Sequence, residues 1–174
     1  MNPRLSLKGR ALQLLAQREH SRLELRRKLL SHARQQLEAD ASQVAGHSGP
    51  DASARRAPPT NELQASVDAL LDLLAEQQHL SEARFVEARV RTRAARHGNL
   101  RIRQELARHG LQLAPEDEQA LKDSEVSRAK EVWLRKFGGP ARDAAGHARQ
   151  VCFLTGRGFS ADVIRRLLRG VDDD

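Results

Sequence analysis

The sequence predicts an all-α protein, built from three tandem three-helix repeats in an elongated, curved helical array. Its dominant residues, Leu, Ala, Arg, Gln and Glu, are good helix formers. Only 3% of the 174 residues are aromatic and tyrosine is absent, which argues against a core of β-strands. In addition, one amphipathic segment occurs twice, as "HSRLELRRKLL" from His20 and as "HGNLRIRQELA" from His97.

The two copies align at an offset of 77 residues, from His20 to His97. We expect the apolar pairs of this alignment to face the core of their repeats, because each repeat buries an apolar face against its neighbour. These pairs are Leu23 with Leu100, Leu25 with Ile102, and Leu29 with Leu106. A second match, Gly110-Leu111 with Gly158-Phe159, extends the repeat into the last third of the chain. The predicted repeats are residues 1–80, 81–123 and 124–174.

The first repeat is predicted to hold an insertion. A helix over 6–17 is followed by Ser21, which caps a second helix that ends near His32 or Ala33. Ala33 stands where the later repeats have glycine, so this helix end is expected to differ. Residues 35–60 then lose the apolar period and are rich in Gly, Ser, Pro and Ala, which predicts disorder. A third helix follows over 62–80.

The second and third repeats have clearer boundaries. Ser81 begins a helix to about His97, and the repeated segment forms the next helix over 99–109. Gly110 supplies a left-handed stop, and Pro115 opens a short helix to residue 123. Separate helices are expected over 124–138, 142–158 and 159–170, the last one capped by Ser160.

Basic charge is concentrated in two blocks. Residues 1–34 hold nine Lys and Arg against two Glu, and residues 81–113 hold eight Arg against three Glu. Residues 35–80 are acidic, with seven acidic and two basic side chains. Residues 114–174 hold equal numbers of acidic and basic side chains. Basic surfaces of this density attract polyanions, although a solvated helical face is the simpler alternative.

The best binding candidate is the helix that contains Arg89, Arg93 and Arg96. Their spacing of four and three residues places the three guanidinium groups on one side, where they form a ridge suited to phosphates or carboxylates. The alternative is an arginine face partly neutralised by Glu82 and Glu87. Further candidates in the two basic blocks are Arg101, Arg108, Arg22, Arg27 and Lys28.

Arg26 and Arg103 fall within the apolar arcs of their helices. We expect each aliphatic stem to pack on leucines and each head group to pair with a carboxylate or reach water.

The sequence offers no pattern typical of an enzyme. The seven histidines are scattered, the lone Cys152 reads as a small core residue, and no glycine-rich phosphate loop or metal-ligand spacing occurs. We expect no catalytic residues, cofactor or metal. No apolar run is long enough to span a membrane, and no signal segment is evident. A monomeric cytoplasmic protein is expected.

Three segments resemble the RecX family in order and spacing: "ALQLLAQREHSRLELRRKL", "LSEARFVEARVRTRAARHGNLRIRQELARHGL" and "LRKFG…FLTGRGFSADVIRRLL". The resemblance implies a cytoplasmic modulator of the RecA recombinase, built from tandem three-helix repeats. It implies a partner in the RecA–single-stranded DNA filament, with restraint of strand exchange, ATP hydrolysis and co-protease activity. Duplex DNA is a further candidate partner. The 35–60 insertion is longer than the family's usual connection.

Two other functions fit the residues. The short turn between 82–97 and 99–109 suits a helix-turn-helix protein that reads duplex DNA, although the hairpin recurs without a polar reading face. The second alternative is a helical scaffold that binds an acidic protein partner.

Overall fold

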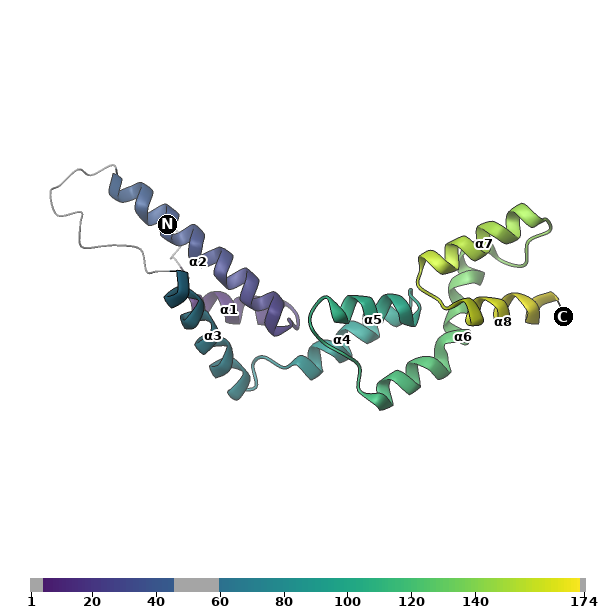
Figure 1. The fold of residues 1–174 in the computed structure, drawn as a ribbon, viewed down its shortest axis with the longest axis horizontal. Coiled ribbons are helices and arrows are strands. Elements are labelled where there is room, and N and C mark those ends of the chain that lie inside the picture. The colour runs from purple at the N-terminus through teal and green to yellow at the C-terminus, as the bar shows by residue number, and fades with distance from the viewer. Residues whose placement is uncertain (1–4, 46–59, 173–174) are drawn as a thin grey trace. The chain divides into compact units, whose positions relative to one another are not determined.

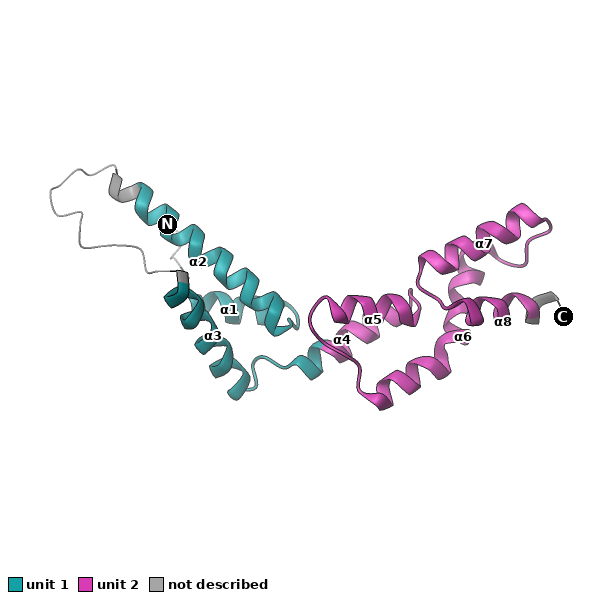
Figure 2. Ribbon diagram, viewed as in Figure 1, with its two compact units in different colours: residues 1–85 teal, residues 86–174 magenta. Residues whose placement is uncertain are grey.

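The computed structural model describes residues 5–45 and 60–172, which divide into two compact units, Met1–Phe85 and Val86–Asp174 (Figures 1 and 2). The described residues are helical, without a strand, as predicted. The helices are α1 (Leu7–Gln17), α2 (Arg22–Ala45), α3 (Thr60–Glu76), α4 (Glu82–Ala94), α5 (Asn99–Ala107), α6 (Pro115–Phe137), α7 (Ala144–Gly156) and α8 (Ala161–Asp172).

Unit 1 contains α1, α2, α3 and the first turn of α4. Two serines cap its first helices: the Ser6 hydroxyl accepts from the Gly9 N–H at 3.1 Å, and the Ser21 hydroxyl accepts from the Glu24 N–H at 3.1 Å. The apolar stripes of the three helices then meet in one core, which includes Ala11, Leu25, Leu29, Val67, Leu71 and Leu74, all fully buried.

Helix α2 is longer than predicted. It continues to Ala45, so residues 35–45 are helical where the sequence analysis expected disorder. The reason lies at Ala33, which is buried within the helix. The glycines at the corresponding places, Gly110 and Gly158, adopt φ values of 72° and 84° and end their helices. Alanine avoids that left-handed region, so the helix continues. The rest of the predicted insertion, 46–59, lies outside the described residues.

Unit 2 contains most of α4 and helices α5 to α8. Trp133 and Phe159, each 1% exposed, are the largest side chains of a core that α6, α7 and α8 share. The Asp143 carboxylate caps α7 at the Gly146 N–H, and the Ser160 hydroxyl caps α8 at the Val163 N–H. The capping role predicted for Ser160 is therefore confirmed.

Helix α6 joins two elements that were predicted to be separate. It runs without interruption from Pro115 to Phe137 and ends at Gly138, whose φ is 72°. The predicted repeat boundary between residues 123 and 124 therefore lies inside one helix. No Gly or Pro interrupts this stretch, and the Ser124 hydroxyl donates to the Ala120 carbonyl at 2.8 Å, within the helix.

Equivalent positions of the duplicated segment share the same burial. Leu25 and Ile102 are fully buried, as are Leu29 and Leu106, in agreement with prediction. Leu23 and Leu100 were expected to face the core, but they are 41% and 46% exposed. Residues two apart on a helix are separated by about 200°, so Leu23 and Leu100 cannot share the buried face of Leu25 and Ile102.

Both arginines of the apolar arcs pair with carboxylates, as predicted. Arg26 holds Asp68 of α3 through two hydrogen bonds of 2.6 and 2.8 Å. Arg103 donates to Glu118 of α6 at 3.1 Å. In each case an ion pair bridges the duplicated helix and the helix that follows it.

Candidate nucleic-acid interface

Glu105 forms ion pairs with two of the three arginines of the predicted ridge. This carboxylate, on α5, pairs with Arg89 at 3.2 Å and with Arg93 at 2.8 Å, and both arginines lie on α4. Two of the three guanidinium groups therefore clamp α4 to α5 and are partly neutralised. Glu105 was not among the carboxylates considered from the sequence, because its contact with α4 depends on how the hairpin closes.

The remaining predicted arginines of unit 2 are open to solvent. Arg96 follows the end of α4, Arg101 lies on α5, and Arg108 is the C-cap residue of α5; all three are exposed. None has a carboxylate within ion-pair distance among the described residues. Arg101 and Arg108 are seven residues apart, or about two turns, so they share one side of α5.

A turn from the last third of the chain lies against the start of α5. The Gly98 N–H donates to the Arg157 carbonyl at 3.0 Å, and the Leu100 N–H donates to the Gly158 carbonyl at 3.1 Å. The His97 N–H donates to the Arg93 carbonyl at 2.9 Å. These backbone contacts bring the end of α4, the start of α5 and the turn before α8 to one place.

Four basic side chains gather there: Arg93, His97, Arg101 and Arg157, which we name the His97 cluster. Burial lowers the pKa of His97 below 6.5, and the positive charges of Arg157, Arg93 and Arg101 lower it further. The ring is therefore mainly neutral at neutral pH. Arg101 and Arg157 supply most of the positive field of the cluster, because Glu105 partly neutralises Arg93. Such a field attracts an anion that can accept from several guanidinium donors.

Arg157 was missed from the sequence, where "GRG" was interpreted as helix punctuation. Its guanidinium lies over the Phe153 ring, 5.0 Å from the centroid, in cation–π geometry. No local pattern distinguishes this residue. Its place in the cluster follows only from the contact of its own backbone with Gly98.

Helix α6 fixes the backbone under the cluster. The Arg128 guanidinium donates to the carbonyls of Ala94 and His97, at 3.1 and 2.9 Å, and to the Asn99 side chain at 2.6 Å. The buried Glu125 carboxylate accepts from the Asn99 N–H at 2.9 Å. These bonds satisfy carbonyls left open at the end of α4 and a donor at the start of α5, so the hairpin carrying the cluster is held rigidly.

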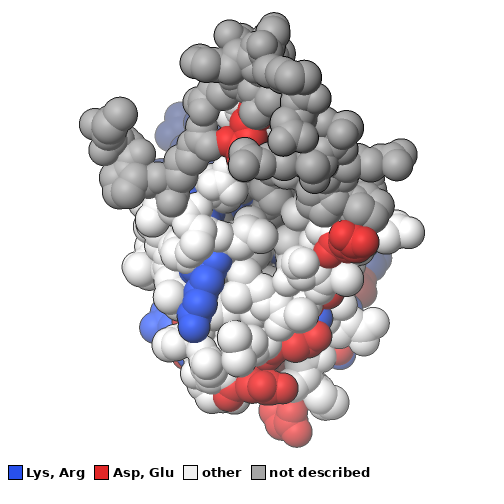
Figure 3. Space-filling view, turned by 90° about the vertical axis from the view of Figure 1, so that its left-hand side faces the viewer, with Lys and Arg blue, Asp and Glu red and all other residues white. Residues whose placement is uncertain are grey.

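The candidates in unit 1 are more fully paired. Arg22 forms an ion pair with Asp72 at 2.7 Å, and Lys28 forms one with Glu24 at 3.2 Å. Arg27 is exposed and has no carboxylate partner in the described part of the chain. On the face shown in Figure 3, the described surface is largely uncharged, with acidic groups gathered along its lower edge. The described residues on this face therefore present few basic groups.

The described residues hold no group of three or more His, Cys, Asp or Glu placed to bind a metal ion. None of the described helices is long and apolar enough to cross a membrane. Cys152 is exposed on α7, so its interpretation as a small core residue was wrong. It follows the partly buried Val151, and consecutive residues of a helix point about 100° apart.

Comparison with known proteins identifies the family. Residues 81–112 match the second three-helix domain of RecX, and residues 123–168 match the third. A protein of Leptothrix cholodnii named "Regulatory protein RecX" is 43% identical, over 99% of this chain and 93% of its own. Proteins of the same name in Ralstonia pickettii and Pseudomonas putida are 40% and 39% identical, over 97% and 98% of this chain and 90% and 94% of theirs. Tandem three-helix domains and high identity over nearly the whole length show that the chain belongs to the RecX family.

Proposed function

We propose that this chain is a negative regulator of the RecA recombinase that acts on the RecA–single-stranded DNA filament. By binding the filament, it restrains strand exchange, ATP hydrolysis and co-protease activity. The regulatory role is supported by the relatives, which are named regulatory proteins. The choice of a nucleoprotein filament as the target is supported by the charge of unit 2.

The observation that carries this proposal is the convergence of Arg93, Arg101 and Arg157 around His97. These side chains come from the end of α4, the start of α5 and the turn before α8, and backbone hydrogen bonds hold the three segments together. A rigid site loses little conformational entropy on binding. Guanidinium groups contact phosphates without reading base edges, so this cluster suits binding that is independent of sequence.

The exposed arginines extend this surface. Arg96 directly precedes His97 in sequence, and Arg108, the C-cap residue of α5, lies two turns beyond Arg101 on the same side. Each phosphate that an arginine neutralises releases condensed counterions, which makes binding depend on salt. A chain bound along the filament would cover DNA backbone that strand exchange needs, and it would hinder rearrangement of the RecA subunits. This accounts for inhibition without any reaction catalysed by the chain itself.

The test compares two double variants that remove the same charge. Arg96→Ala with Arg101→Ala changes exposed arginines at the candidate surface. The control, Arg91→Ala with Arg142→Ala, changes two other exposed arginines of unit 2. Strand exchange by RecA is measured with each variant at several salt concentrations. The wild-type chain and the control should inhibit, and the Arg96/Arg101 variant should inhibit less.

If these arginines contact single-stranded DNA, the slope of log affinity against log salt should fall by about 0.7 per lost contact. An unaltered slope and unaltered inhibition in the folded Arg96/Arg101 variant would show that the surface is wrong. A wild-type chain that leaves strand exchange unaffected but protects a discrete duplex sequence would instead establish the helix-turn-helix alternative.

A further inference from the structure

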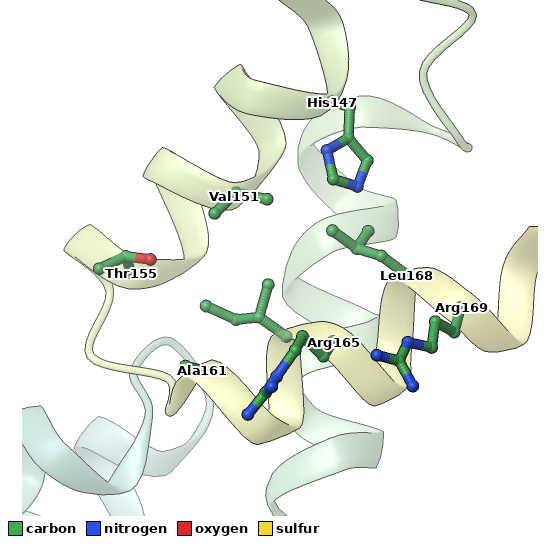
Figure 4. Close-up of a pocket in the computed structure, with 8 residues that line it drawn as sticks. His147, Val151, Thr155, Ala161, Arg165, Leu168 and Arg169 are labelled. Atoms are coloured by element: carbon green, nitrogen blue, oxygen red, sulfur yellow. The ribbon is translucent and has the colours of Figure 1, made fainter. Parts of the chain in front are cut away.

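A groove lies between α7 and α8 in unit 2, apart from the His97 cluster (Figure 4). Its volume is about 280 Å³, and its floor and walls are formed by Val151, Thr155, Ile164 and Leu168. Figure 4 shows Val151 and Thr155 on α7 facing α8 across the groove, with Arg165 and Arg169 on α8 at its rim. This volume is below the roughly 300–1,000 Å³ of small-molecule pockets, so the groove suits a single apolar side chain.

The groove occurs where the earlier helix pairs carry an ion pair. Arg26 and Asp68 bridge α2 and α3, and Arg103 and Glu118 bridge α5 and α6. At the offset of 48 that aligns Gly110 with Gly158, the residue equivalent to Arg103 is Val151. At the same offset, the residue equivalent to Glu118 is Arg166, which is exposed.

Neither member of the bridging ion pair is therefore kept between α7 and α8: Val151 replaces the arginine, and Arg166 replaces the carboxylate. The polar bridge that spans the other two helix pairs is missing here, and the surface between the helices is apolar and open. Without the arginine at position 151, the surface formed by Val151, Ile164 and Leu168 is apolar, and another side chain can cover it.

The charges at the rim select the kind of partner. Among the residues that the structure describes, no carboxylate lines the groove. Arg165 pairs with Asp162 in its own helix, whereas Arg169 is exposed and has no carboxylate partner among the described residues. His147 also lines the groove. An apolar groove with basic groups at its edge is complementary to a segment that carries carboxylates beside an aliphatic side chain.

We infer that the groove between α7 and α8 docks an acidic protein segment, which inserts one aliphatic side chain beside Val151 and Leu168 and places carboxylates at Arg169 and Arg165. The inference rests on the proposed function, and it assigns this groove to the protein component of the filament rather than to its DNA. The lining is aliphatic, whereas surfaces that bind unpaired bases use aromatic side chains as stacking platforms. The chain thus binds the filament through two surfaces of different chemistry.

The test fills the groove from its solvent side. Thr155 is exposed, so Thr155→Trp can cover the groove without entering the core. Ala120→Trp, at an exposed site on α6, is the matched control. A second variant, Arg169→Glu, reverses the charge at the rim, with Arg142→Glu as its control. Far-UV circular dichroism and urea midpoints check that each variant is folded.

Binding is measured by fluorescence anisotropy with two probes: RecA filaments on single-stranded DNA, and the same DNA without RecA. Thr155→Trp and Arg169→Glu should each weaken filament binding by about tenfold, as expected when an anchoring contact is lost. Thr155→Trp should bind the bare DNA as the wild type does, and both controls should match the wild type with both probes.

Three outcomes would overturn the inference. A folded Thr155→Trp variant that binds filaments as the wild type does would overturn it while leaving the proposed function intact. Equal weakening with bare DNA and with filaments would identify the groove as a nucleic-acid site instead. A wild-type chain that binds RecA filaments no more tightly than bare DNA would overturn the proposed function, and the inference with it.

Discussion

The backbones of Gly98 and Gly158 are in direct contact. A Cβ atom placed on Gly98 would lie 2.3 Å from the Gly158 carbonyl oxygen, and one placed on Gly158 would lie 2.5 Å from the Arg101 Cβ. Hydrogen bonds on both sides of this contact, from Gly98 to Arg157 and from Leu100 to Gly158, hold the two segments together. Neither glycine can gain a side chain unless backbone moves.

Gly98→Ala should therefore separate the turn at Arg157 from the start of α5. We expect the free energy of unfolding to fall by about 1–3 kcal/mol, the range for overpacking in a closed space. DNA affinity should fall as well, because the cations of the His97 cluster move apart. Urea denaturation and anisotropy measure the two effects. Gly139→Ala is the control, since a Cβ there meets nothing within 4 Å.

Among the basic residues of α6, Arg128 should be the one whose substitution lowers the free energy of unfolding most. Arg128→Gln removes donors to the carbonyls of Ala94, His97 and Leu121, which lie at 3.1, 2.9 and 3.0 Å. Because unsatisfied buried groups cost about 1–3 kcal/mol each, we expect a loss of roughly 3 kcal/mol in urea denaturation. Arg135→Gln, at an exposed position of the same helix, should change stability by less than about 0.5 kcal/mol. Similar small losses in both variants would contradict this assignment.

Glu24 should contribute to acid sensitivity. Burial raises its pKa, but hydrogen bonds from Arg18 and Lys28 outweigh this and lower the pKa from 4.5 to about 2. The folded protein therefore binds fewer protons at this site than the unfolded chain does. Its stabilising contribution is present above pH 4.5 and is lost as the pH falls toward 2. In Glu24→Gln the urea midpoint should depend less on pH over this range, while Glu38→Gln, on the same helix, serves as the comparison.

His97 should couple DNA binding to proton uptake. Burial and the neighbouring Arg157, Arg93 and Arg101 lower its pKa below 6.5 in the free protein, so protonation below that pH opposes folding. A bound phosphate offsets the positive field and raises the pKa again. Affinity for single-stranded DNA should therefore increase as the pH falls below 6.5, although the free protein becomes less stable.

The measurement for this coupling is anisotropy between pH 5 and pH 8 in buffers with different enthalpies of ionisation, with calorimetry to count the protons taken up. His97→Gln should remove part of the pH dependence. His79→Gln, at an exposed site in unit 1, should retain it. Proton uptake that is identical in wild type and His97→Gln would exclude this residue.

Local features of the chain could be predicted because their causes lie within a few residues. The cap at Ser160 and the helix end at Gly110 depend on hydrogen bonds and φ values of adjacent residues. The pairing of Arg26 with a carboxylate was likewise predictable, because a charged head group on an apolar arc needs a partner. Which carboxylate it meets, Asp68, depends on how α3 packs.

The errors also have local causes. Helix α2 continues past Ala33 since alanine avoids the left-handed conformation that ends the equivalent helices. Helix α6 is continuous because no Gly or Pro near Asp123 and Ser124 forces the chain to turn. In both cases the apolar periodicity lapses, but the helix continues because no helix-terminating residue is present.

By itself, the sequence determined the helical class, the duplicated segment and the burial of Leu25, Leu29 and their equivalents Ile102 and Leu106, because helix propensity and apolar spacing act along one helix. Only the tertiary structure decided that Glu105 forms ion pairs with Arg89 and Arg93, and that Arg157 lies close to His97 and Arg101. Those relationships link residues brought together by packing, with Arg157 docked through the close approach of Gly98 and Gly158. Contacts of this kind depend on how helices pack and loops close, and no periodicity within a single helix encodes them.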